Sequence, residues 1–316
     1  MRHVLSTLCA VLAALLAAAA LAGGQIDQLL REEEPVREIA GDLPAQEGFA
    51  EAAVEMMVEE LTGEDEDALP SGVQEAVSGM ASSVLKEDQT LEAWDESLQT
   101  SREDFAGELE RLFHEGGTGS PEDLVVALDL SPMAAATTEP LRERLEGLLG
   151  WLPFFDESSF DALAPEIVVN LDAVAEDGAD PYQWAAGAEA SKHWTVMAGG
   201  AALLGLLAMV IGVGRGRWAA LALGGLLGLG LGLGLWIALA VASPDLTPPQ
   251  PIPPAAEVLL GHVQARLTDW ARPAWWIFTG ACSVVVVVGL LGAVLTPSRG
   301  PDPAGSSVGH DDLLRV

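Results

Sequence analysis

Two polar residues near the ends of short apolar runs are the best candidates for ligand chemistry in this sequence. Asp129 lies in the run 124–130 and Asn170 in the run 166–171, and both runs have the Val and Ile content of strands. If the strands are parallel, both side chains lie near one carboxyl edge, where open sheets bind ligands. The alternative is that each residue caps the turn or helix after it. Asp129 and Asn170 therefore form a candidate ligand site, which a ligand- or metal-dependent enzyme would use.

Other constellations in the chain give weaker chemical signals. Glu110 and His114 are four residues apart, so on a helix they could share a metal ion, although a His near a helix C-terminus is also stabilised by the dipole. Cys9 and Cys282 both lie in apolar segments and form no disulfide framework or metal knuckle. Residues 24–193 contain no nucleophile elbow, zinc-protease helix, phosphate loop or dinucleotide fingerprint. We therefore assign no catalytic, cofactor-binding or metal-binding residue and expect no enzyme.

The elements that would position these residues are mostly helical. Apolar residues recur at helical spacing over 49–61 and 73–85, and a longer helix is expected from about Leu91 to His114. A helical connection of about 35 residues links the two expected strands, which suits a right-handed parallel crossover packed on the helices. Residues 181–192 are expected to run into the next apolar segment as one helix. The fold class is therefore mostly α, with a small two-stranded β element.

Three uncharged apolar stretches near the C-terminus are long enough to cross a bilayer, which takes about 20 residues. They cover 195–213, 218–242 and 274–295. A fourth apolar run, 4–22, is followed by a site suited to signal cleavage, with Ala20 and Ala22 in the small positions. Residues 1–23 are thus a signal anchor or a signal peptide, and the length of the run favours the anchor.

The charges flanking these spans predict an orientation. Arg215 and Arg217 lie in the turn 215–217 and Arg299 in the tail 297–316, which places the turn and the tail in the cytoplasm. Tryptophans at the expected boundaries agree, because their rings prefer the headgroup level. The outer boundary has Trp194, Trp270, Trp275 and Trp276, and the inner boundary has Trp218.

The domains follow from this orientation. Residues 24–193 form an acidic extracytoplasmic domain, 194–214, 218–242 and 273–296 are transmembrane helices, and 243–272 is an outer loop with a Pro-rich spacer and an amphipathic helix. That helix is expected either on the outer leaflet or against the exported domain.

The exported domain is intensely acidic, with 41 Asp and Glu residues against 8 Lys and Arg in residues 24–193. Such a surface repels nucleic acid and anionic headgroups. Its acidity indicates either adaptation to high salt or cation binding, and the run 64–67 lacks the pattern of a calcium loop.

The middle span carries glycines at four-residue spacing, namely Gly224, Gly228 and Gly232. Small residues at this spacing let another helix approach closely, either within this chain or from a second chain. The three C-terminal spans contain no ionisable side chain, which argues against transport by this chain alone.

Three stretches carry a resemblance to a known group of proteins: Trp94 to Gly116, LVVALDLSP at 124–132 and IVVNL at 167–171. Their order resembles that in uncharacterised actinobacterial multi-pass membrane proteins with an exported helical domain ahead of C-terminal spans. The resemblance covers about residues 25–295. It implies a bacterial envelope protein and transfers no catalytic residues.

These observations together predict a multi-pass plasma-membrane protein whose exported domain is a non-enzymatic interaction or structural module. An accessory subunit of a transport or envelope-processing complex is the alternative. The expected partners are membrane lipid and a protein that binds the exported domain or the Gly-rich span, and nucleic acid is not expected.

Overall fold

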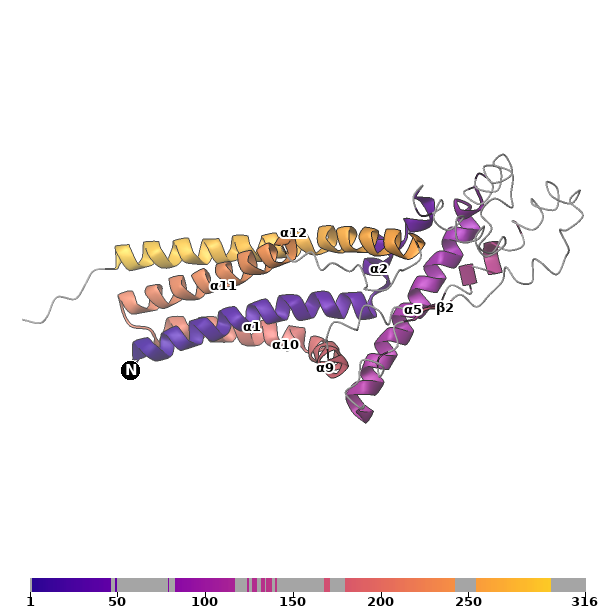
Figure 1. Cartoon of the computed structure of the whole chain (residues 1–316). Coiled ribbons are helices and arrows are strands. Elements are labelled where there is room, and N and C mark those ends of the chain that lie inside the picture. The colour runs from indigo at the N-terminus through magenta and orange to yellow at the C-terminus, as the bar shows by residue number, and fades with distance from the viewer. Residues whose placement is uncertain are drawn as a thin grey trace, which may run out of the picture. The chain divides into compact units, whose positions relative to one another are not determined.

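The computed structural model describes residues 2–46, 49, 79, 83–116, 124, 127–129, 132, 133, 135–137, 140, 168–170, 180–241 and 254–296. They form two compact units (Figure 1). We call Met1–Ala18, Gly199–Gly232 and Phe278–Val316 the span unit, and Ala19–Ala198 with Leu233–Ile277 the acidic unit. The predicted helices 49–61 and 73–85 and the acidic run 64–67 lie almost wholly outside the described residues.

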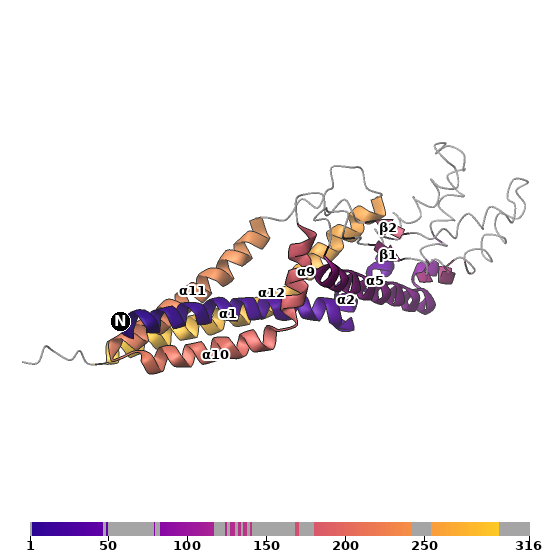
Figure 2. The same ribbon diagram turned by 90° about the horizontal axis from the view of Figure 1, so that it is seen from below.

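Four helices in the described part of the chain are long and apolar enough to cross a membrane. They are α1 (Arg2–Arg31), α10 (Trp194–Ile211), α11 (Arg215–Val241) and α12 (Pro254–Leu295). The chain is thus a mostly helical, multi-pass membrane protein, as the apolar runs predicted. In the span unit these helices lie side by side (Figure 2), and Cys9, Ala10, Ala208 and Ala220 form a buried cluster between them.

The helix α12 is much longer than a bilayer requires. Its 42 residues span about 63 Å at 1.5 Å per residue, against about 30 Å for the hydrocarbon core. The amphipathic segment predicted before the last span is therefore continuous with that span, and Pro273 lies inside the helix. In the acidic unit, Val263 and Trp270 pack on a buried cluster, which favours packing against the domain over a place on the leaflet.

The acidic unit is built on α2 (Glu33–Ala40), the short 3-10 helix η1 (Leu43–Ala45) and the long α5 (Asp88–Glu115). The prediction of a helix from about Leu91 to His114 is confirmed in α5. Gly116 ends it with a φ of 74°, a left-handed conformation that glycine adopts without strain. Trp94 is fully buried among Ile39, Leu43 and Leu98, and its Nε1 donates to the Ala40 carbonyl at 2.7 Å.

Two short strands are described, β1 (Ala127–Asp129) and β2 (Val168–Asn170). Their pairing is antiparallel, with Ala127 opposite Asn170 and Asp129 opposite Val168. The parallel arrangement predicted from the sequence is therefore wrong. Three residues per strand do not establish a sheet, and the predicted β element stays a prediction.

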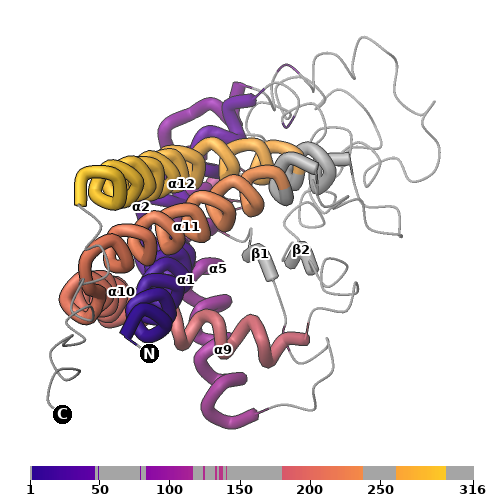
Figure 3. Tube along the Cα trace, turned by 90° about the vertical axis from the view of Figure 1, so that its left-hand side faces the viewer, coloured from indigo at the N-terminus to yellow at the C-terminus, as the bar shows by residue number. Residues whose placement is uncertain are grey.

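The helix α9 (Pro181–Ser191) is separate from the span that follows it. We predicted one continuous helix here, but Lys192 and His193 form a turn before α10 begins at Trp194. Asp180 caps the start of α9, where its carboxylate accepts from the Tyr182 backbone amide at 2.9 Å. In the acidic unit α9 lies crosswise to α1, which is viewed nearly end-on in Figure 3 while α9 is seen lengthwise.

Candidate functional site

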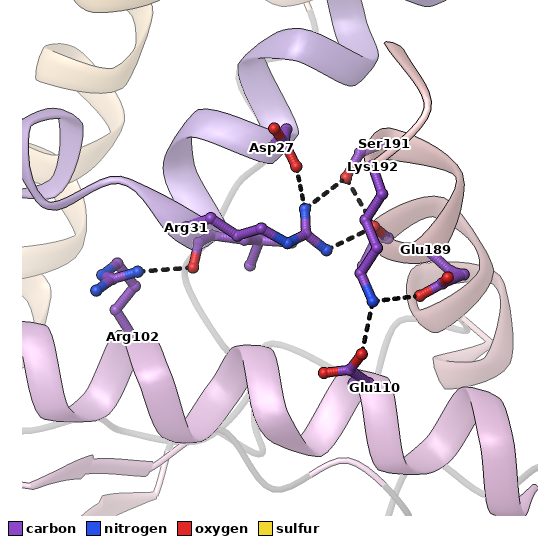
Figure 4. A network of polar contacts seen from close by, with 9 residues as sticks. Asp27, Arg31, Arg102, Glu110, Glu189, Ser191 and Lys192 are labelled. Atoms are coloured by element: carbon purple, nitrogen blue, oxygen red, sulfur yellow. Dashed lines mark hydrogen bonds and ion pairs between the residues drawn. The ribbon is translucent and has the colours of Figure 1, made fainter. Parts of the chain in front are cut away.

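Three scarce cations of the acidic unit meet where α1, α5 and α9 come together (Figure 4). They are Arg31 at the end of α1, Arg102 on α5 and Lys192 just after α9. We call this cluster the polar junction.

Arg31 fixes α9 to the last turn of α1. Its Nη2 donates to the Ala188 carbonyl at 3.1 Å and its Nη1 to the Ser191 hydroxyl at 3.2 Å, while Asp27 pairs with the guanidinium one turn earlier. Arg102 joins α5 to the last turn of α1, because its Nη1 donates to the Leu30 carbonyl at 2.8 Å. Both arginines thus satisfy carbonyls near helix ends, which otherwise lack partners.

Lys192 joins α9 to α5 through two carboxylates. Its Nζ lies 2.6 Å from Glu110 Oε1 and 2.7 Å from Glu189 Oε2. Hydrogen bonds from Lys192 lower the pKa of both Glu110 and Glu189, and the same two carboxylates raise the pKa of Lys192. The three groups are therefore ionised over the whole physiological range, which suits a structural clamp better than proton transfer.

Apolar contacts complete the junction beneath these charges. Leu109 and Leu112 of α5 are buried against Ala185 and Ala188 of α9, with Leu30 of α1 packed on the cluster. The small alanines let α9 approach α5 closely, and this burial supplies most of the attachment because exposed ion pairs contribute little.

A second group of ion pairs ties the other parts of the acidic unit together. Arg37 of α2 makes a two-pronged contact with Asp95 of α5, at 3.0 and 2.7 Å, and this pairing lowers the pKa of Asp95. Asp42 accepts from Arg266 of α12 at 2.7 Å, and His262 lies 3.4 Å from the same carboxylate. Cations from α2 and α12 thus bind carboxylates elsewhere in the unit.

The three glycines of the middle span face two different helices of the span unit. A Cβ at Gly224 would lie 2.8 Å from the Ala10 carbonyl oxygen on α1. One at Gly228 would lie 2.6 Å from Cys282 Sγ, and one at Gly232 would lie 2.7 Å from Thr279 Oγ1, both on α12. Each of these glycines contacts a helix of the same chain.

The contacts between α11 and α12 form one antiparallel seam. A glycine lies at most levels of the seam, so that Trp218 lies on Gly292, and Val286 lies on Gly225. Arg215 closes the seam, donating from Nε to the Thr296 carbonyl at 2.7 Å. The complete set of pairs is Arg215 with Thr296, Trp218 with Gly292, Ala222 with Gly289, Gly225 with Val286, Gly228 with Cys282 and Gly232 with Thr279.

Two further residue pairs were singled out in the sequence, Asp129 with Asn170 and Glu110 with His114. Antiparallel pairing puts Asp129 and Asn170 at opposite ends of the strand pair, so the shared carboxyl edge does not exist. Their side chains lie outside the described part, and the candidate ligand site stays a prediction. The Glu110 carboxylate pairs with Lys192, while His114 Nδ1 lies 2.9 Å from the Glu110 carbonyl oxygen. Within the described residues, no group of three or more His, Cys, Asp or Glu side chains could hold a metal.

No protein-family model, curated protein or solved structure matches this chain. Its class is therefore defined by its own features, namely the four apolar helices found among the described residues and the helical acidic unit.

Sequence reasoning missed the residues of the polar junction. The sequence offered one clue, the scarcity of Lys and Arg. Residues 24–193 contain 8 of them and 41 Asp and Glu residues. Each cation therefore has many possible anionic partners and is a candidate for a structural role. The exposed aromatics of α9, Tyr182 and Trp184, were missed as well. They gave no periodic signal, since they are two residues apart on a short helix.

Proposed function

We propose that this chain is an integral protein of a bacterial plasma membrane whose acidic, exported domain is a non-enzymatic interaction or structural module of the cell envelope. One observation carries the proposal: α1 and α12 each run from the span unit into the acidic unit, where Arg31 and Arg266 bind other parts of that unit. A domain that is continuous in the chain with two membrane helices is suited to binding a partner at the membrane.

The charges support the outward orientation of the domain. In the span unit, Gly216 contacts His3 and Arg215 binds Thr296, so the start of α1, the turn before α11 and the end of α12 share one end. Arg2, Arg215 and Arg217 lie there without a nearby carboxylate in the sequence. The excess of Lys and Arg on cytoplasmic loops favours this end inside and the acidic unit outside.

The accessory-subunit alternative predicted that the Gly-rich span docks on a catalytic chain. Gly224, Gly228 and Gly232 contact α1 and α12, which favours packing within this chain for these three residues. In this alternative the catalytic chain would therefore dock on another face of α11, where Leu226 is 54% exposed.

Site-specific photo-crosslinking of the full chain in native membranes distinguishes the two functions. One crosslinker replaces Glu103 on α5, whose side chain is 70% exposed, and the matched one replaces Leu226 on α11. An envelope module gives protein adducts from position 103, and an accessory subunit gives them from position 226. Adducts from neither position, together with an intact envelope in a deletion strain, would contradict the proposal. Labelling of a cysteine at position 103 by an impermeant maleimide on intact cells tests the orientation separately.

A further inference from the structure

The helix α9 has an unusual surface for a part of the acidic unit. Its only carboxylate is Glu189, which pairs with Lys192. Two large aromatic side chains are left in water, with Tyr182 48% and Trp184 53% exposed. Leaving apolar area of this size uncovered costs free energy, so the surface is suited to a partner with both apolar and polar character.

Contacts with α1 fix the level of α9 relative to the membrane-spanning sequence. Gly23 is the first residue after the apolar run 4–22, and a Cβ there would lie 3.7 Å from Ser191 Cα and 3.4 Å from Trp194 Cβ. The end of α9 therefore lies where the apolar part of α1 gives way to polar sequence. Trp275 lies at the same level, with its Nε1 donating to Gln25 Oε1 at 2.8 Å.

The direction of α9 and the placement of Trp184 follow from the same contacts. Because α9 runs crosswise to α1 (Figure 3), it stays at this level along its length. Trp184 precedes Ser191 by seven residues, two helical turns, so it lies on the face of α9 that meets Gly23. Ala185 and Ala188 pack on α5, whereas the Trp184 side chain, one turn before Ala188, is 53% exposed.

We propose that α9 is an interfacial helix that lies in the lipid headgroup layer, with Trp184 as its anchor. A Trp ring fits this layer because its apolar body enters the acyl boundary while its N–H finds a hydrogen-bond acceptor among the ester groups. Because the one carboxylate of α9 is paired with Lys192, the helix suits the glycerol and ester region common to phospholipids and does not require an anionic headgroup. The inference does not depend on which side of the membrane the acidic unit occupies.

Depth measurement on the full-length protein tests this inference. Residues 184 and 103 are each replaced by a spin-labelled cysteine in a Cys9→Ala, Cys282→Ala background, and the protein is reconstituted in phosphatidylcholine vesicles. The label at 184 should collide more with oxygen, which concentrates in lipid, and that at 103 more with a water-soluble nickel chelate. Equal accessibility of both labels to the nickel chelate would overturn the inference, and so would a label at 184 shielded from both reagents, because a protein would then cover it.

Intrinsic fluorescence gives a second measurement that keeps Trp184 in place. Wild-type protein and Trp184→Phe are reconstituted in phosphatidylcholine with and without bromine on the acyl chains. The difference between the wild-type emission and that of Trp184→Phe is the emission of Trp184. The brominated lipid should strongly quench this difference. Emission from Trp184 that is unaffected by bromine would place the ring in water and contradict the inference.

Discussion

Single cations of the acidic unit each bind several groups from different elements. Arg31 binds a carboxylate, a hydroxyl and a carbonyl through one planar guanidinium, and Arg102 caps the Leu30 carbonyl. Lysine cannot reproduce the forked geometry of Arg31. The attachment of α9 to α1 therefore depends on the residue type and not on positive charge alone.

Lys192→Met should lower the melting temperature of the full protein by a few degrees at neutral pH. Glu110 and Glu189 have lowered pKa values beside Lys192, so their contribution to stability is present above the ordinary pKa of a glutamate, about 4.3, and is lost as the pH falls through the lower folded value. Lys192 has a raised pKa, so its contribution persists to high pH and is lost only as the pH rises through that raised value. The difference from wild type should thus be full at pH 7 and should disappear as the pH falls through the lowered pKa values of Glu110 and Glu189.

Lys86→Met is the matched control for this experiment, because it removes the same charge from an exposed position of the same unit. Thermal unfolding in detergent across a pH series provides the measurement. Equal decreases in melting temperature in the two variants would mean that the decrease comes from the change in net charge and not from the loss of the ion pairs with Glu110 and Glu189.

Among the elements, α11 and α12 are matched by the size of their side chains. At Gly289 the close approach is to backbone atoms of Ala222 and Trp218, which cannot move aside as a flexible side chain does. Interiors packed this closely tolerate added volume poorly.

Gly289→Ala should destabilise the packing of the spans by about 1–3 kcal/mol. The added Cβ would lie 2.6 Å from the Ala222 nitrogen and 2.8 Å from the Trp218 carbonyl oxygen, so the two helices must separate. Gly280→Ala, in the same helix, is the control, since a Cβ there meets nothing within 4 Å. Denaturant or thermal titration in detergent measures both variants, and a destabilisation of similar size in each would refute the seam.

For the whole molecule, the shared helices explain how a strongly anionic domain stays attached to an apolar bundle. The first part of α1 belongs to the span unit, where Ser6 donates to the Ala208 carbonyl at 2.7 Å, and its last turns belong to the acidic unit. Cleavage after Ala22 would separate these two parts. This arrangement favours the signal anchor over the cleaved signal peptide.

The mature protein should therefore retain residues 1–22. Gly224 and Ala208 would lose their partners on α1 if that helix were removed, leaving a gap beside α10 and α11. Intact mass and N-terminal peptide mapping of protein purified from its native membrane provide the measurement. A mature chain that begins at Gly23 would contradict this expectation.

The sequence by itself determined the apolar helices, the separation of charge and the helix α5. Each depends on local properties, namely hydropathy over a span of residues, periodic apolar positions around Trp94 and a glycine stop at Gly116. The glycine spacing likewise marked a close-packing face on α11.

Only the tertiary structure decided which segments meet. The sequence did not reveal that β1 and β2 are antiparallel, that α9 turns across α1, or that Gly224 faces α1 while Gly228 faces α12. These outcomes depend on contacts between residues far apart in the chain. Lys192 illustrates the reason: many carboxylates are available in the sequence, and packing alone brings Glu110, 82 positions away, within 2.6 Å.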